Sequence, residues 1–285
     1  MSDIWGTQIN ESPYKKQEFG AGDPNMLFVG SEKSGKTSLL NIFFKRQEEP
    51  HPTLALTYQS CGVKVAGRPI TLHAWELGGG LQLESILDTI VTENTQNGFL
   101  IFICLDLSSA SSIIDAVDWA ERVDSRFAEK RRAVFFIGTH YDVFEGKDPH
   151  EKEIIVKGLR AVAAQHNAGI CFTSTKHENL KARFKNIIKY VGIANAKIKE
   201  KEDDNSKPII FGPGEDSDSK NDNDSVAAMM NQMAQEAANE REKSPKDHTN
   251  PAQNPQFAEE DIDQLCAARK SELVEQTKRS EKKSK

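Results

Sequence analysis

The stretch from Met26 to Thr37, MLFVGSEKSGKT, joins a short apolar run to a glycine-rich loop, and the residues from Lys36 to Phe44 predict a helix directly after it. The loop fits the pattern GxxxxGK[ST] in the strand-to-helix context that gives this pattern its meaning. Two glycines let the backbone wrap around a phosphate, and the N–H groups of the loop and of the helix start form an anion site. Lys36 is placed to reach terminal phosphates, and the Thr37 hydroxyl is a candidate ligand for Mg²⁺. The candidate nucleotide-binding residues here are Gly30, Ser31, Glu32, Lys33, Ser34, Gly35, Lys36 and Thr37.

Outward from this loop, short apolar runs alternate with amphipathic stretches as far as residue 195. The apolar runs predict strands and the amphipathic stretches predict helices between them. Such alternation is typical of an α/β fold, here a doubly wound, mostly parallel sheet with helices on both faces, and its layout resembles that of a small GTPase with a phosphate-binding loop (P-loop). Strands are expected at 26–30, 62–66, 70–75, 99–105, 133–138 and 170–173, a hairpin turn at 67–69, and helices at 36–44, 111–129, 151–166 and 180–191.

The composition changes near residue 195, where charged and amide side chains replace the apolar runs. Residues 203–224 hold seven acidic residues and two lysines, with too little apolar surface to offset chain entropy. Residues 227–243 have helical propensity but a weak apolar face, so a helix there needs a partner. The expected divisions are an N-terminal extension (1–23), a GTPase-like P-loop domain (24–195), an acidic and polar linker (196–249), and a C-terminal attachment segment (250–285), largely disordered or extended and ending in a helix at 259–278.

The overall charge and hydropathy exclude some classes of function. The 285 residues include 37 Lys and Arg and 43 Asp and Glu, a net charge of -6, which argues against a general nucleic-acid coat. The longest apolar stretch, residues 98–107, has about half the length of a bilayer span, so no membrane insertion is expected. The four cysteines stand far apart and are expected to be free thiols.

Further residues match the magnesium side of a small GTPase site. Thr53 precedes the hairpin where such a protein has its switch threonine. Residues 75–80 read WELGGG and resemble a WDTAGQ segment, which places Glu76 where an aspartate holds the magnesium-bound water. With nucleotide bound, the expected Mg²⁺ set is therefore Thr37, Thr53 and Glu76. Gly80 falls where the water-orienting glutamine would stand, and since glycine has no side chain, we expect no catalytic residue and no efficient hydrolysis.

The base side of the expected site is altered. Residues 139–142 read THYD where a small GTPase has NKxD. Asp142 is kept and can accept hydrogen bonds from a guanine edge, whereas threonine and histidine replace the asparagine and the lysine. Residues 174–176 read STK and resemble the SAK segment that supports the base. Base contacts are expected from Asp142, Ser174 and Lys176, with weakened recognition, and the cofactor is expected to be GTP or GDP with Mg²⁺, or none.

Several segments together resemble the dynein light intermediate chains, and among them the type found in cytoplasmic dynein 2. WELGGG and PTLALxY are the specific part of the likeness, and the histidine in THYD departs from the family's lysine. In this sequence the matching segments are PTLALTY (52–58), WELGGG (75–80), IGTHYDVF (137–144), CFTS (171–174), KPIIF (207–211) and NPAQNPQFAE (250–259).

This resemblance implies a non-catalytic subunit whose GTPase-like domain packs on the tail of the dynein 2 heavy chain and stabilises it. It implies a role in retrograde intraflagellar transport and in assembly of cilia and flagella, with other dynein 2 subunits and intraflagellar transport trains as indirect partners. The implied location is the cytoplasm, the cytoskeleton and the cilium or flagellum, including the basal body and axoneme.

Two other hypotheses stay open at this point. The intact loop, Thr53 and Asp142 also fit a Rab-like switch that binds and slowly hydrolyses GTP, although Gly80 and Glu76 count against it. A GTPase-like adaptor outside dynein would show the same residues. Identification of the binding partner separates these hypotheses.

Overall fold

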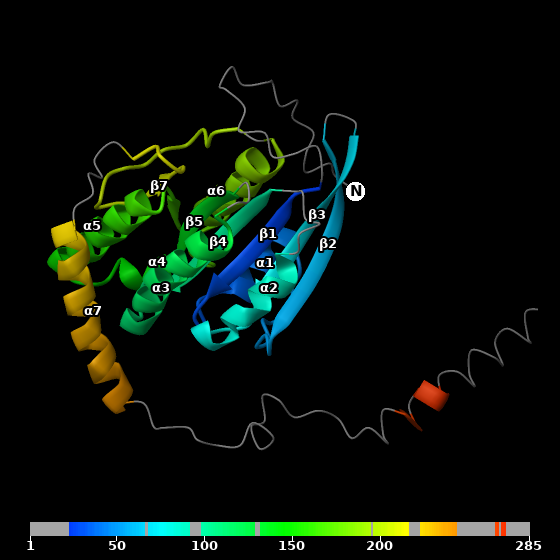
Figure 1. Cartoon of the computed structure of the whole chain (residues 1–285), viewed down its shortest axis with the longest axis horizontal. Coiled ribbons are helices and arrows are strands. Elements are labelled where there is room, and N and C mark those ends of the chain that lie inside the picture. The colour runs from blue at the N-terminus through cyan, green and yellow to red at the C-terminus, as the bar shows by residue number, and fades with distance from the viewer. Residues whose placement is uncertain are drawn as a thin grey trace, which may run out of the picture. The chain divides into compact units, whose positions relative to one another are not determined.

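The computed structural model describes residues 23–243 apart from 66–67, 92–97, 129–131, 195 and 217–222, together with 266–267 and 269–271. Its centre is a seven-stranded sheet in the order β2-β3-β1-β4-β5-β6-β7 (Figure 1). The five central strands run parallel, and the edge strands β2 and β7 pair antiparallel with their neighbours. The strands are β1 (Asn25–Gly30), β2 (Leu56–Val65), β3 (Arg68–Leu77), β4 (Phe99–Asp106), β5 (Arg132–Thr139), β6 (Gly169–Phe172) and β7 (Ile210–Phe211).

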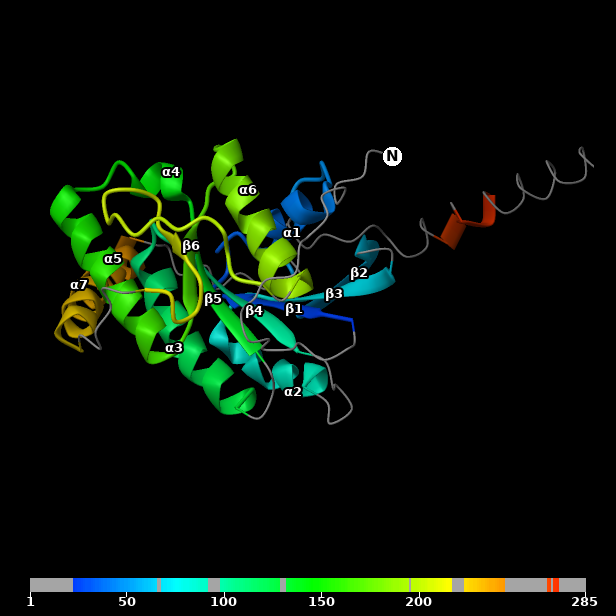
Figure 2. The ribbon, with the colours of Figure 1, turned by 90° about the horizontal axis from the view of Figure 1, so that it is seen from above.

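Helices cover both faces of this sheet, as the alternating pattern predicts (Figure 2). One face carries α1 and α6, which continues into the π-helical segment η2, and the other carries the 3-10 segment η1, α2, α3, α5 and α7. The short α4 follows β5. The bounds are α1 (Lys36–Phe44), η1 (Leu81–Ile86), α2 (Leu87–Ile90), α3 (Ala110–Arg126), α4 (Tyr141–Phe144), α5 (Pro149–Gln165), α6 (Glu178–Ile187), η2 (Ile188–Ile193) and α7 (Asn223–Lys243).

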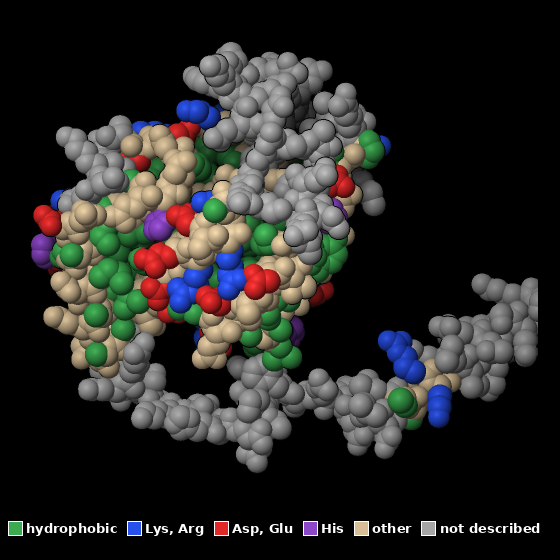
Figure 3. Space-filling view, viewed as in Figure 1, with side chains coloured by type: hydrophobic (Ala, Val, Ile, Leu, Met, Phe, Trp, Pro, Cys, Tyr) green, Lys and Arg blue, Asp and Glu red, His purple; other side chains and the backbone are tan. Residues whose placement is uncertain are grey.

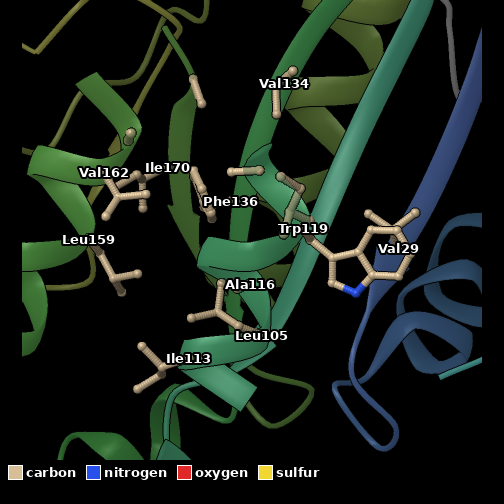
Figure 4. Packing of buried hydrophobic residues seen from close by; sticks show 14 of the residues in the cluster. Val29, Leu105, Ile113, Ala116, Trp119, Val134, Phe136, Leu159, Val162 and Ile170 are labelled. Atoms are coloured by element: carbon tan, nitrogen blue, oxygen red, sulfur yellow. The ribbon is translucent and has the colours of Figure 1, made fainter. Parts of the chain in front are cut away.

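Burial on both faces explains why the central strands read as continuous apolar runs. Every residue of β1 is buried, and all of β4 except Asp106 is buried. Side chains that point to one face pack against α3, whose Trp119 is fully buried and lies next to Val29 of β1 (Figure 4). The expected strand and helix positions in this part of the chain agree with the structure to within a few residues.

The hairpin is longer than the sequence analysis expects. Its first strand begins at Leu56 rather than at Gly62, and Arg68 and Pro69 lie in β3 rather than in the turn. None of the added residues 56–61 of β2 is buried, and Tyr58 is 47% exposed, so the clean apolar–polar alternation of a strand with one buried face is missing here. A polar, half-exposed edge strand gives little periodic signal.

The interval expected to be a linker is also different in the part that the structure describes. Ile210 and Phe211 form β7 and are buried beside β6, and Ile210 is bridged on its other side by Glu202. The helix α7 packs through Met229 and Met233 into the same apolar cluster as α3 and α5. This segment is therefore part of the folded domain rather than a linker.

A buried ion pair holds this segment to α5. The guanidinium of Arg160 donates to both carboxylate oxygens of Asp216, at 2.8 and 2.5 Å, and also to Asn205 Oδ1 and the Asp203 carbonyl at 2.6 and 3.0 Å. The side chains of Arg160 and Asp216 are 7% and 6% exposed. Asp216 is one of the acidic residues that suggest a solvated linker in the sequence, but in the structure it is the buried partner of Arg160 on α5.

The chain divides into two compact units, residues 1–242 and 243–285. Beyond Lys243, the last residue of α7, the second unit is described only at 266–267 and 269–271, which are helical. The remainder of the expected helix at 259–278, the extension at 1–22 and the linker residues 217–222 and 244–249 lie outside the described residues. None of the described helices combines the length and apolar character needed to cross a membrane.

Candidate functional site

The candidate site lies where the parallel strands β1, β3, β4 and β5 end. The loop from Gly30 to Thr37 follows β1 and leads into the nine-residue helix α1. The N–H groups of the loop and of the first turn of α1 can together bind an anion. Gly30 and Gly35 have positive φ angles of 139° and 83°. A Cβ at Gly30 would lie 2.1 Å from the Cys104 carbonyl oxygen, which explains why glycine is required there.

Lys36 is held inside its own loop. Its Nζ donates to the Ser31 carbonyl at 2.7 Å, to the Gly30 carbonyl at 3.1 Å and to Ser34 Oγ at 3.4 Å, and the residue is 5% exposed. Burial lowers the pKa of Lys36, while the nearby charges of Glu76 and Glu32 act in the opposite direction. The ammonium is therefore pre-positioned at the loop with neutral hydrogen-bond acceptors around it.

The three residues expected to hold Mg²⁺ lie together. Thr37 Oγ1 donates to Glu76 Oε1 at 2.5 Å, and Thr53 also donates to the Glu76 carboxylate. Glu76 is 1% exposed, and burial raises its pKa although both hydroxyls oppose that shift. Among the described residues no cluster of three His, Cys, Asp or Glu side chains could hold a metal ion. Mg²⁺ at this set would need phosphate oxygens and water as further ligands.

The three glycines of WELGGG bring β3's end against two other segments. Gly78 N donates to the Ala55 carbonyl at 2.6 Å, and a Cβ at Gly78 would lie 2.5 Å from the Thr53 carbonyl oxygen. A Cβ at Gly79 would lie 2.5 Å from Glu32 Cα, so this glycine touches the P-loop backbone. Gly80 has a φ of 95° and open space around its Cα. The segment is thus packed onto the P-loop itself.

On the base side, the predicted residues bind one another. Asp142 accepts from Ser174 Oγ and from Lys176 Nζ, each at 2.6 Å. The Lys176 ammonium, with the Ser174 hydroxyl, lowers the pKa of Asp142 to about 2. Asp142 therefore carries its charge throughout the neutral range, and both of its oxygens already have protein partners.

Two residues beside Asp142 have roles that the sequence analysis misses. Thr139 Oγ1 lies 3.1 Å from the Ser34 carbonyl and 3.1 Å from the Leu105 carbonyl, so it ties β5 to the P-loop and to β4. His140 Nδ1 lies 3.2 Å from Asp106 Oδ2, and this carboxylate raises the pKa of His140. The sequence signal that could have pointed to these roles is the THYD pattern, because it places Thr139 and His140 at the end of β5, next to the P-loop and β4.

Comparison with known proteins agrees with this geometry. The sequence profile of the Ras family matches residues 25–192, which is more than half of the chain. The chain belongs to the Ras family. Its P-loop, its Thr37–Glu76 contact and its Asp142 cluster stand at the ends of the Ras-family strands.

The curated relatives extend over nearly the whole chain. Proteins named cytoplasmic dynein 2 light intermediate chain 1 are 29% identical in Bos taurus, 28% in Rattus norvegicus and 26% in Danio rerio. These alignments cover 92%, 92% and 91% of this chain, and 90%, 89% and 86% of the relatives. The likeness therefore continues beyond the Ras-family match at residue 192.

One position of this Ras-family domain bears on hydrolysis. Gly80 stands at the position expected for the glutamine that orients water, and it carries no side chain. The geometry provides an anion cradle and a hydroxyl–carboxylate pair, but it places no side chain at Gly80 to orient water.

Proposed function

We propose that this chain is a non-catalytic light intermediate chain of cytoplasmic dynein 2. In this role it stabilises the tail of the heavy chain and supports retrograde intraflagellar transport and assembly of the cilium or flagellum. The observation that carries the proposal is the extent of the likeness: the relatives bearing the dynein 2 name align with about nine-tenths of this chain. That span includes β7 and α7, which lie outside the Ras-family match.

The altered catalytic positions support a structural role. Hydrolysis in this class needs a side chain that orients water, and Gly80 has none. Gly79 packs against Glu32, so the segment that would respond to a terminal phosphate already lies on the P-loop. We infer that force and ATP hydrolysis belong to the heavy chain and that this subunit contributes binding surface.

The proposed direct partner is the heavy chain, with other dynein 2 subunits and intraflagellar transport trains as indirect partners. The proposed location follows from these partners: the cytoplasm, the cytoskeleton and the cilium or flagellum, with the basal body and axoneme. The C-terminal residues 250–285 are proposed as a second attachment segment, since residues 250–259 resemble the family beyond the folded domain.

A bound guanine nucleotide is proposed as a structural ligand of this site. The cradle from Gly30 to Thr37 fits a phosphate group, Lys36 supplies the positive charge, and Asp142 with Ser174 and Lys176 faces the base. Mg²⁺, if present, would lie at Thr37, Thr53 and Glu76. The nucleotide would supply phosphate negative charge to the loop, and its binding would stabilise the fold by mass action without turnover.

Affinity purification of the tagged full-length chain from ciliated cells tests the dynein assignment. Wild type, Lys36→Ala and the matched loop variant Lys33→Ala are compared, with partners identified by mass spectrometry. We expect a dynein 2 heavy chain with all three forms, because Lys36 is predicted to serve the nucleotide and not the partner. Loss of the heavy chain from Lys36→Ala alone would assign the loop to assembly. No heavy chain with any form would overturn the proposal.

The contacts of Thr37 and Thr53 with Glu76 favour a second candidate function, that of a Rab-like switch that binds and slowly hydrolyses GTP. Single-turnover hydrolysis of GTP by the purified chain separates the two. A Gly80→Gln variant is the informative comparison in this assay, since it restores the missing side chain. Hydrolysis by wild type, together with a partner that binds only the GTP form, would favour the switch.

A further inference from the structure

One peptide group at the end of β4 contacts two hydroxyl side chains from other elements. It is the peptide group that joins Leu105 to Asp106, so its C=O belongs to Leu105 and its N–H to Asp106. The N–H donates to Ser112 Oγ of α3 at 2.9 Å. The C=O accepts from Thr139 Oγ1 of β5 at 3.1 Å. The start of α3 and the end of β5 are therefore both fixed to the same point of the sheet.

Each of these two hydroxyls also contacts the P-loop. Ser112 Oγ lies 2.6 Å from Ser31 Oγ, and Thr139 Oγ1 donates to the Ser34 carbonyl at 3.1 Å. Thr139 shares its single proton between two carbonyls at equal distances, in a bifurcated hydrogen bond. Its methyl group lies against Gly35, because a Cβ on Gly35 would be 3.1 Å from Thr139 Cγ2. The P-loop is thus attached to the end of β4 through a hydroxyl on each of two sides.

The two loop residues held in this way also contact the ammonium group of Lys36. Its Nζ donates to the Ser31 carbonyl at 2.7 Å and to Ser34 Oγ at 3.4 Å. A shift of Ser31 or Ser34 would move these acceptors, and it would move the N–H groups of the loop as well. The placement of the charge and of the N–H donors therefore depends on side chains outside the loop.

Water does not replace these contacts easily, because the residues that make them are buried. Ser31, Ser34, Ser112 and Thr139 are each at most 8% exposed. When a buried hydrogen bond is removed, the group left behind has no partner and keeps the cost of its desolvation. The loss of either hydroxyl should therefore loosen the loop.

The start of α3 differs from its solvent-facing side in how its polar side chains are used. Acidic and basic side chains are interspersed over α2 and α3 (Figure 3), where Arg122 and Arg126 pair with carboxylates of η1 and α2. Ser125 is exposed on the same helix and donates to the Arg122 carbonyl. Ser112 lies in the first turn and contacts the P-loop instead. One helix thus offers a serine tied to the site and a serine that is not.

We propose that Ser112 and Thr139 are positioning residues for the phosphate-binding loop. They hold Ser31 and Ser34 so that the loop has its anion-binding shape before a ligand arrives, and less ordering is then needed on binding. The ligand class is a nucleotide phosphate, bound by the N–H groups of the loop and by Lys36. This inference rests on the nucleotide ligand proposed above and does not depend on the dynein assignment.

The affinity of the full-length chain for fluorescently labelled GDP, with Mg²⁺ present, tests the proposal. Ser112→Ala and Thr139→Val each remove one hydroxyl, and valine keeps the methyl contact with Gly35. Each variant should bind GDP ~5-fold more weakly, the factor that corresponds to one hydrogen bond. Thr139→Ser keeps the hydroxyl and should stay within about 2-fold of wild type. Ser125→Ala is the matched control on α3 and should leave the affinity unchanged.

A double variant tests whether Ser112 acts through Ser31. In a Ser31→Ala background, Ser112→Ala should have almost no further effect on the affinity, because the contact between the two hydroxyls is already lost. An equal effect in both backgrounds would overturn the assignment of Ser112. Thermal unfolding is measured for each variant, and affinities are compared at a temperature at which all variants are folded. Lower stability without weaker binding would show a structural role alone and would also overturn the proposal.

Failure of this inference and failure of the proposed ligand give different results. If wild type binds GDP and the hydroxyl variants bind it equally well, the positioning roles are overturned and the nucleotide ligand is kept. If wild type does not bind GDP, the proposed ligand is overturned together with the positioning roles.

Discussion

Lys36 and Arg160 are both buried cations of the same domain, but their surroundings differ. Arg160 is matched by a carboxylate in bidentate geometry and by two further acceptors. Lys36 is surrounded by two carbonyls and a hydroxyl of its own loop. The charge of a buried cation that pairs with a carboxylate is already balanced within the fold. The charge of a buried cation that contacts only neutral acceptors is not balanced there and is available to an anionic ligand. The comparison separates the part of the molecule that holds the C-terminal extension from the part that can bind phosphate.

The largest effect is expected from removing the buried cation that has a carboxylate partner, Arg160. Arg160→Leu should lower the free energy of unfolding by about 3–5 kcal/mol, because it leaves the Asp216 carboxylate buried without its partner. Urea unfolding monitored by fluorescence measures the change. Arg122→Leu on α3 is the control: its side chain is 34% exposed, and its loss should cost about 1 kcal/mol or less. If Arg160→Leu and Arg122→Leu lowered the free energy of unfolding equally, the buried Arg160–Asp216 pair would not differ in stability from an exposed ion pair.

The next effect concerns the packing of the P-loop. Gly79→Ala should destabilise the domain by about 1–3 kcal/mol, since its Cβ would overlap the backbone of Glu32. Gly62→Ala on β2 is the control, because a Cβ there meets no atom within 4 Å. Thermal unfolding of both variants without added nucleotide gives the comparison. A neutral result for Gly79→Ala would mean that the loop is free to move away from WELGGG.

A smaller effect of opposite sign is expected at Glu76. Burial raises its pKa above the ordinary 4.5, so the folded state favours the protonated form. Its contribution to stability is therefore fully present below pH 4.5 and is lost as pH rises through the folded pKa. Glu76→Gln keeps an acceptor for Thr37 without the buried charge, and should raise stability at neutral pH by about 1 kcal/mol. Unfolding across this pH range, without Mg²⁺ or nucleotide, tests it; lower stability at neutral pH would contradict it.

The smallest effect lies at the rim of the site. Asp106 raises the pKa of His140 above 6.5, so stability from this pair is fully present below pH 6.5 and is lost as pH rises through the folded pKa. His140→Gln should flatten this slope, by about 1 kcal/mol or less because the side chain is 43% exposed. His150→Gln on α5 is the control. An unchanged slope in His140→Gln would place the pH dependence elsewhere.

Much of the fold follows from short-range pattern. The apolar runs of β1 and β4 and the bounds of α1 follow directly from periodicity and from the P-loop motif. The pairing of Thr37 with Glu76 follows from motif spacing. Arg160 and Asp216 could not be paired in this way, since they are 56 positions apart and each reads as a solvated charge. Such contacts depend on which segments pack together, and periodicity within one segment does not report that.

The placement of β2 and β7 at the two edges of the sheet has a consequence for self-association. At β7 the outer side of Ile210 is already paired with Glu202, and the strand has only two residues. At the other edge β2 is ten residues long, and no further strand flanks it among the described residues. Among the described residues, edge pairing between copies is thus open at β2 and blocked at β7. Two copies that paired through β2 would therefore form a closed pair, because the same contact could not be repeated at β7.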